Sequence, residues 1–217
     1  MSQVSQAPAP ELPSSSQAPV WVLLCSVKDP GNLGSIIRTC YYLGVSRLII
    51  TGSRCQLSSV VSKSSAGTLE IFPVFSVRDS RTWVRSLQQD GWRVLAADIP
   101  DCRDQHEEDE KDDEKEEDCR VTPGQSHVSL DQLQTSVKPT LLGESSVQLS
   151  DRDHFSSFPV LGSEGGGIPP DLLSEVQETV SISSSRAVDG THLDSLNVSV
   201  AAAIIIHSLC SHLRDQR

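Results

Sequence analysis

The sequence lacks the paired cysteines of a zinc site and the long apolar runs of a membrane protein. It has six cysteines in 217 residues, none in Cys-x-x-Cys spacing, which argues against a metal site. No apolar stretch reaches the length of about 20 residues that spans a bilayer. The N-terminus resembles neither a transit peptide nor a signal peptide, so the chain shows no targeting address. We expect reduced, buried thiols in an intracellular protein.

Positive charge is also scarce, since the formal net charge is −11. However, eleven acidic residues and only two lysines lie between Asp104 and Asp118, and the rest of the chain has 18 acidic and 16 basic residues. Phosphate binding favours a positive surface, so the position of the acidic residues along the chain matters more than the net charge. Composition indicates a solvated, disordered acidic insert, which leaves nucleic-acid binding open. The alternative is an active role, such as mimicking RNA or gating a site.

Polar composition divides the chain into a domain and two further segments. Residues 1–18, rich in Pro, Ser, Ala and Gln, are typical of a disordered lead. The domain is expected at 19–217, interrupted by a polar, acidic, disordered segment at about 101–158. What remains is ordinarily apolar and long enough to bury a core.

Apolar runs alternate with helical patterns along this domain. Val20–Cys25 and Arg47–Thr51 are continuous apolar runs, typical of strands buried on both faces. Between them, Leu33–Leu43 places its apolar residues on one helical face. A parallel βαβ unit follows from this order, and the fold class is α/β with a mostly parallel sheet flanked by helices.

The remaining elements are expected from the same two patterns. We expect further strands at Ile71–Val77, Trp92–Ala97, Pro159–Gly162 and Val180–Ser183. We expect further helices at Arg81–Asp90, Leu130–Val137, Pro169–Glu178 and Ser195–Leu213, with Ser195 as the N-cap of the last, and a short helix or loop at Val60–Gly67.

Three segments carry residues suited to chemistry. In DPGNLGSIIRTC, Asn32 lies in a strand-to-helix turn, and Arg38 is expected to lean back over Gly34 toward it. In LGSEGGGI, the glycines let backbone approach a ligand closely, and Glu164 is the only charged group. The spacing matches neither a P-loop nor a dinucleotide fingerprint, which disfavours a generic nucleotide-binding domain.

The third segment, DSLNVSVAAAIIIHSL, begins a very apolar helix. Asn197 is a poor interior helix former and needs a partner, whereas His207 is more typical of a helix surface than of a catalytic base. Taken singly, each segment has an ordinary structural explanation: a turn Asn with a surface Arg, a flexible loop, and a capped buried helix.

Together and in this order, the three segments resemble the signature segments of the SpoU group of SPOUT methyltransferases. The likeness covers about Val20 to Leu213, without the polar segment. In addition, VVSKSSAGTLEIFPVFS is similar to mitochondrial members of that group that modify a guanosine of large-subunit rRNA. The resemblance implies a mitochondrial, S-adenosylmethionine-dependent ribose 2′-O-methyltransferase acting on rRNA, with a C-terminal trefoil knot and a homodimeric active site.

Site roles follow from the same resemblance, position by position. It implies a catalytic group at Asn32, Arg38, Glu164, Ser195 and Asn197. It implies cofactor contacts, largely through backbone, at Gly162, Ile182 and Leu196. After Ile182 this chain reads Ser-Ser-Ser, where the family commonly has Pro-Met, so the cofactor loop departs from the pattern.

Two departures raise an alternative, a catalytically impaired isoform acting as an RNA-binding or ribosome-assembly protein. Family members of this branch usually carry an RNA-binding domain before the first strand, where this chain has about 18 residues. Furthermore, Lys138–Leu142 (KPTLL) and Val160–Gly162 (VLG) would join into one buried strand, but Gly143–Pro159 separates them. We hypothesise an inserted exon or alternative transcript, which shortens the strand unless Phe158 and Pro159 substitute.

A chain lacking residues 143–159 tests whether this insertion is damaging. A strand lost from a parallel sheet costs several kcal/mol, about as much as total stability, so if the insertion leaves the strand short, the shortened chain is expected to express better and melt at a higher temperature. Equal melting temperatures of the two chains would rule out a damaging insertion.

Overall fold

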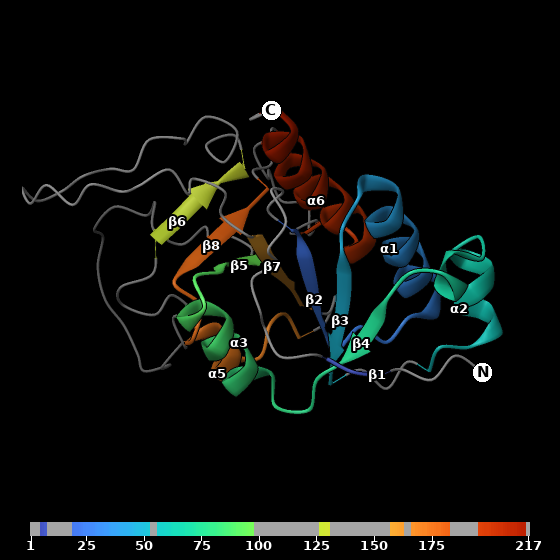
Figure 1. Ribbon diagram of the computed structural model, residues 1–217, viewed down its shortest axis with the longest axis horizontal. Coiled ribbons are helices and arrows are strands. Elements are labelled where there is room, and N and C mark those ends of the chain that lie inside the picture. Colours follow the sequence, from blue (N-terminus) through green and yellow to red (C-terminus); the bar gives the residue numbers. More distant parts are fainter. Residues whose placement is uncertain are drawn as a thin grey trace, which may run out of the picture.

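The computed structural model describes residues 5–7, 19–52, 56–97, 126–130, 157–162, 166–182 and 195–215, with side chains to residue 211. Its strands are β1 (Ser5–Gln6), β2 (Trp21–Cys25), β3 (Arg47–Thr51), β4 (Val74–Ser76), β5 (Arg93–Ala97), β6 (Ser126–Ser129), β7 (Ser157–Leu161) and β8 (Glu178–Ser181). Its helices are α1 (Pro30–Leu43), α2 (Ser59–Ser64), the 3₁₀ turn η1 (Thr68–Glu70), α3 (Ser80–Gln89), α5 (Pro170–Leu173) and α6 (Val198–Asp215) (Figure 1).

The strands form one sheet in the order β1-β4-β3-β2-β7-β5-β8-β6. Every pairing among the described strands is parallel, as in Leu23 with Ile49 and Ala96 with Val160. The predicted α/β class with a parallel sheet and flanking helices is therefore confirmed. Because parallel strands end at the same edge, the segments after β2, β7 and β8 all leave the sheet on one side, where open α/β sheets bind ligands.

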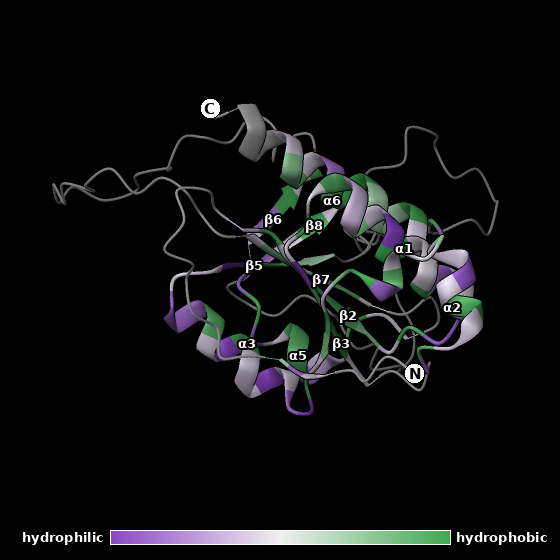
Figure 2. Ribbon diagram, turned by 45° about the vertical axis from the view of Figure 1, so that its right-hand side comes forward, coloured by the Kyte–Doolittle hydropathy of each residue, from purple (hydrophilic) through white to green (hydrophobic). Residues whose placement is uncertain are grey.

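Helices cover both faces of the sheet, and successive strand residues alternate between them. On one face, Leu24 and Ile50 belong to an apolar cluster that includes α1 and α6. On the other, Leu23 and Ile49 pack with α3 and α5. Figure 1 shows α1 and α6 side by side, away from α3 and α5, and Figure 2 shows apolar residues in the strands and along α6. Burial on both faces explains the continuous apolar runs of the sequence.

Several boundaries differ from those expected. The third strand is only β4, because residues 68–72 turn through η1, which leaves Ile71 exposed. The helix expected at Pro169–Glu178 is only α5, and β8 begins at Glu178, because the β-branched Thr179 and Val180 favour extended backbone. Of the helix expected at Leu130–Val137, only Leu130 lies within the described residues.

The start of α6 also corrects a prediction. The N-cap is Asn197, not Ser195: its carbonyl accepts from the backbone N–H groups of Val200 and Ala201, and its side chain accepts from that of Ser199. Asn and Ser are both good caps, so sequence alone does not separate them. Ser195 therefore lies two positions before the N-cap and three before Val198, the first helical residue.

Two edge strands come from segments predicted to be disordered. Ser5–Gln6 of the lead pairs with β4, and Ser126–Ser129 of the polar segment pairs with β8. Leu130 is buried in the core, which anchors this second piece. For these residues the expectation of disorder is wrong, because backbone pairing and one buried leucine hold short polar strands that composition does not indicate. The remainder of 1–18 and of 101–156 lies outside the described residues.

Strand β7 is completed by the residues just before Val160. Ser157, Phe158 and Pro159 are buried and pair with Arg93, Val94 and Leu95 of β5, so they substitute for the separated Lys138–Leu142. On the β2 side, the ladder runs through Val20–Ser157, Leu23–Val160 and Leu24–Leu161 and skips Phe158 and Pro159. A proline has no N–H to donate and is rarely found inside a sheet, which explains the gap.

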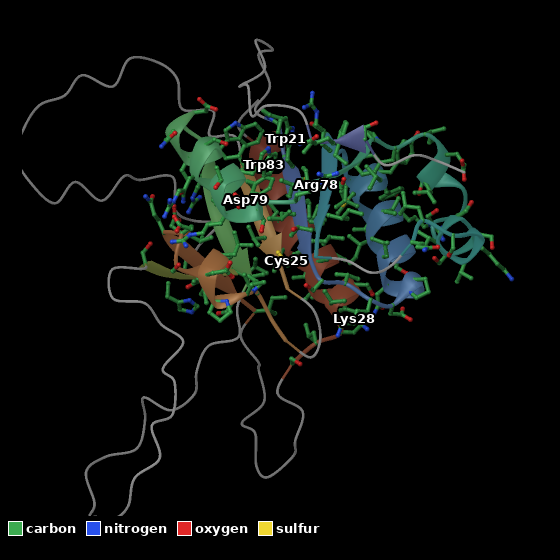
Figure 3. The ribbon with its side chains drawn as sticks, turned by 90° about the horizontal axis from the view of Figure 1, so that it is seen from below. Trp21, Cys25, Lys28, Arg78, Asp79 and Trp83 are labelled. Carbon is green, nitrogen blue, oxygen red and sulfur yellow. The ribbon has the colours of Figure 1, made fainter. Side chains whose placement is uncertain are left out.

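Phe158 joins an aromatic cluster at the amino-terminal end of β2. Its ring lies 5.3 Å from Trp83 and 6.4 Å from Trp92, and Trp92 lies 4.4 Å from Trp21, between ring centroids. Figure 3 shows Trp21 beside Trp83 at this end of the strand. The Arg47 guanidinium covers Trp21 at 4.4 Å from the ring centroid, a cation–π contact. A large apolar side chain at 158 therefore compensates for the missing ladder bond of Pro159.

Phe158→Ala is expected to lower the free energy of unfolding by about 3–5 kcal/mol, because it leaves a cavity beside Trp83 and Trp92. Chemical denaturation measures the change. Tyr42→Ala is the matched control: Tyr42 is 84% exposed, so its loss should change stability by less than about 0.5 kcal/mol. Equal effects of the two variants would contradict the assignment of Phe158 to the core.

Candidate active site

The chain turns sharply where β2 and β3 end. Ser26 follows β2 in a left-handed conformation, with φ of 56°, and its N–H donates to Thr51 O at 2.9 Å. Gly52 follows β3 with φ of 59°, and a Cβ there would lie 2.8 Å from Ser26 Oγ. In Figure 3, Trp21 and Cys25 mark the two ends of β2, and Lys28 lies beyond Cys25. Strained backbone of this kind is typical of functional edges.

Asp29 fixes the first turn of α1, which carries Asn32. The Asp29 carboxylate accepts from Asn32 N–H at 2.7 Å, and Pro30 occupies the first helical position. An acidic cap followed by proline is a favourable helix start, because the cap satisfies a free N–H and proline lacks one. Asn32 is the third residue of the helix, and its backbone N–H is held by the Asp29 side chain.

Asn197 meets Asn32 from the start of α6. The Asn197 Nδ2 donates to Asn32 Oδ1 at 3.2 Å, although the two residues are 165 positions apart. Asn197 Oδ1 accepts from Ser199 N–H at 2.9 Å and from Ser199 Oγ–H at 2.6 Å. The structure therefore brings together two residues that the sequence singled out, one from the first segment and one from the third.

Arg38 lies on α1 with an exposed side chain. The expectation that it leans over an open space at Gly34 is wrong. Gly34 is buried, and a Cβ there would lie 1.8 Å from Ser64 Oγ and 2.8 Å from Val61 O, so α2 occupies that space. Ser64 also donates to Pro30 O at 3.2 Å, which ties α2 to the first turn of α1. The glycine allows two helices to touch.

The glycine segment leaves the sheet at the end of β7. A Cβ on Gly162 would lie 2.2 Å from the carbonyl carbon of Gly167 and 2.5 Å from Ile168 N, so the loop returns with backbone directly against backbone. Gly167 has φ of 60°, in the left-handed region. Only glycine at 162 permits this approach. Glu164 lies outside the described residues.

The other predicted residues occupy the same side of the sheet. Ile182 directly follows β8 and packs, partly buried, against the core cluster of α1 and α6. Ser195 and Leu196 precede α6; both are exposed, Leu196 at 46%. Since strand order places β5 between β7 and β8, Gly162 and Ile182 leave the edge on either side of β5.

The nearby thiols are poorly suited to chemistry. Burial, reinforced by the Asp171 carboxylate, raises the pKa of Cys25 to about 12, and burial also raises the pKa of Cys40. A thiol with such a pKa is neutral at physiological pH and is a weak nucleophile. Cys25, Cys40 and Cys210 are buried and form no disulfide, as expected, and Cys55, Cys102 and Cys119 lie outside the described residues.

Neither a metal site nor a membrane-spanning helix is found among the described residues. In that part of the chain, no group of three or more His, Cys, Asp or Glu side chains could hold a metal ion. None of the helices there combines the length and the apolar character needed to cross a bilayer.

Comparison with known proteins assigns the chain to a family. The model of the SpoU rRNA methylase family matches residues 19–122 and 126–207, most of the chain. The chain belongs to the SpoU rRNA methylase family. The described helix ends that carry Asn32 and Asn197, and the loop that begins at Gly162, all lie within these matched ranges.

Relatives share the family but are longer. The chain is 33% identical over 204 residues to human "rRNA methyltransferase 1, mitochondrial", covering 92% of this chain and 47% of that protein. It is 30% identical over 199 residues to the Schizosaccharomyces pombe protein of the same name, covering 90% and 52%. The chain thus spans about half the length of these relatives.

A solved structure shares the fold. The AdoMet-bound rRNA methyltransferase of Sinorhizobium meliloti superposes with a TM-score of 0.61 at 21% identity, covering 91% of this chain and 58% of that one. This likeness supports the arrangement of the parallel sheet and its flanking helices.

Three contributors to the site were not predicted. Asp29 could have been found from the sequence, because Asp followed by Pro is a common helix start; we interpreted Lys28–Asn32 only as a turn. Ser199 bonds the side chain of Asn197, two residues before it, and Ser64 bonds the Pro30 carbonyl, 34 residues away in the sequence; neither serine was given a site role from the sequence.

Gly34→Ala is expected to destabilise the protein by about 1–3 kcal/mol, because the added methyl group meets Ser64 and the Val61 carbonyl and forces α2 away from α1. Thermal and chemical unfolding measure the loss. The neighbouring Ser35→Ala adds no atoms and should change stability by less than about 0.5 kcal/mol. Unchanged stability in Gly34→Ala would mean that the two helices are not in close contact.

Proposed function

We propose that this chain transfers a methyl group from S-adenosylmethionine to a ribose 2′-hydroxyl of rRNA. The observation that carries the proposal is the hydrogen bond between Asn197 and Asn32, which unites the first and third family segments at the ligand-binding edge of the sheet. The names of the relatives, which are rRNA methyltransferases, support the same reaction. The alternative of a non-catalytic ribosome-assembly protein is not favoured, because these relatives are named as enzymes and Phe158 and Pro159 complete β7.

The residues at the edge fit the cofactor. Gly162 keeps the returning backbone of Gly167 and Ile168 close against the end of β7, so the contact that this loop would offer the cofactor is made by backbone. Ile182 and Leu196 would add apolar contacts from the end of β8 and the start of α6. A solved structure of similar fold is titled as AdoMet-bound, which supports this choice. When bound, the sulfonium supplies the activated methyl group, and the protein orients and polarises the hydroxyl that accepts it.

Each polar residue has a role that its chemistry allows. A guanidinium keeps its proton up to a pH of about 12 or higher, so Arg38 is better suited to stabilise the developing oxyanion or hold a phosphate than to act as base. Asn32 and Glu164 orient Arg38 or the ribose. Asn197 holds the Asn32 amide, and Ser195, exposed before α6, is available to RNA or a second subunit.

The proposal includes a C-terminal trefoil knot and a homodimer, both from family resemblance. In support of the dimer, Leu196 and Val200 flank Asn197 and are each 46% exposed. Apolar side chains beside a polar site are typical of surfaces that associate, and a second copy of the chain would cover them. A dimer would also bring a second set of polar residues to each site.

A mitochondrial location and a guanosine of large-subunit rRNA complete the proposal. The relatives from human and fission yeast are both named as mitochondrial, which supports the location. The chain is close to neutral outside its acidic run, so the domain itself does not repel RNA strongly.

Arg38→Ala is expected to abolish methyl transfer to rRNA while S-adenosylmethionine still binds, because Arg38 acts on the hydroxyl and the cofactor contacts lie elsewhere. Transfer is measured with labelled cofactor, and binding by calorimetry. Lys63→Ala, on the exposed side of α2, should retain both and serves as the charge-matched control. Equal loss of transfer and of cofactor binding in Arg38→Ala would show that the role of Arg38 is wrong.

A further inference from the structure

Ser199 lies on the first turn of α6 and directs two donors at a single atom. Its backbone N–H and its hydroxyl both bond to Asn197 Oδ1, at 2.9 and 2.6 Å. Helix capping requires only the first of these bonds. The second is an additional constraint on the Asn197 side chain, in a position that the family resemblance does not assign to the site.

The consequence of two donors is a fixed direction for the Asn197 amide. A carboxamide has an accepting oxygen on one side and a donating NH₂ on the other. With its oxygen held by Ser199, Asn197 turns Nδ2 toward Asn32, where it donates to Oδ1. If this amide were reversed, its NH₂ would face the Ser199 backbone N–H, which can only donate, and that bond would be lost.

The same argument extends to Asn32. Because Asn32 presents its oxygen to α6, its own NH₂ points away from Asn197. The Asn32 backbone is held separately by Asp29, and the contact with α6 fixes the place of the Asn32 side-chain oxygen. A reversed Asn32 would present an acceptor where a donor now lies.

We infer that Ser199 is a positioning residue, whose hydroxyl acts with its own backbone N–H to hold the Asn197 side chain in place against Asn32 at the methyl-transfer site. The inference rests on the proposed function, since it assigns the relay to that reaction. The hydroxyl matters more than the volume of the side chain, so threonine should substitute for serine and alanine should not.

The test compares the variants Ser199→Ala and Ser199→Thr with the unmutated protein, each as the full chain. Selective ¹⁵N-asparagine labelling reports the side-chain amide signals of Asn32, and steady-state assays with rRNA report kcat and KM. Ser211→Ala is the matched control, because Ser211 is also on α6 and bonds His207 at 3.4 Å, away from the site. Calorimetry with S-adenosylmethionine measures cofactor affinity.

In Ser199→Ala, the Asn32 side-chain signals are expected to shift and kcat to fall about two- to tenfold, the effect of one neutral hydrogen bond. Cofactor affinity and the KM for rRNA should stay within about twofold. Ser199→Thr should restore both the signals and kcat, and Ser211→Ala should change neither. A loss of helix capping alone would lower the melting temperature without this pattern.

Two outcomes would overturn the inference: Asn32 signals that stay unchanged in Ser199→Ala, or shifted signals with kcat unaltered. Failure of the proposed function looks different, because the unmutated chain would then transfer no methyl group to ribose. In that case the Asn32 signals alone decide whether Ser199 holds the Asn197 side chain against Asn32, and an unmoved signal would reject the relay.

Discussion

The site depends on a contact between two helix starts, at which the Asn197 amide donates to that of Asn32. The contact exists because α1 and α6 share one face of the sheet, where Ile36 and Ile37 belong to the same buried cluster as Ile206. Each asparagine lies on or just before the first turn of its helix, held by a capping bond. Core packing therefore sets the positions of the backbones, and short polar bonds set the directions of the amides.

Most of the fold could be predicted from the sequence, because the two patterns that reveal strands and helices are both local. Continuous apolar runs predicted β2 and β3, and helical spacing predicted α1. The meeting of Asn32 with Asn197 followed only from family resemblance, since periodicity carries no information on which segments become neighbours. Gly34 shows the limit of local argument: its missing side chain was assigned to Arg38, whereas the structure fills the space with Ser64.

Strand β7 shows how a sheet tolerates an unfavourable sequence. Pro159 interrupts the ladder with β2, yet the ladder with β5 remains continuous and Phe158 packs among the tryptophans. Burial of about one aromatic side chain offsets the loss of one backbone hydrogen bond, which is worth about 0.5–1.5 kcal/mol. Edge strands β1 and β6 are built from polar segments and are held by backbone pairing, with the buried Leu130 directly after β6, so composition alone could not recognise them.

The central claim is that this edge of the sheet directs a methyl group to ribose. The most direct measurement incubates the purified chain with S-adenosylmethionine and a large-subunit rRNA fragment, then digests the RNA to nucleosides for mass spectrometry. The account predicts a nucleoside methylated on its ribose 2′-oxygen, a guanosine if the resemblance extends to the target. Methylation on a base, or no methylation although the cofactor binds, would contradict it.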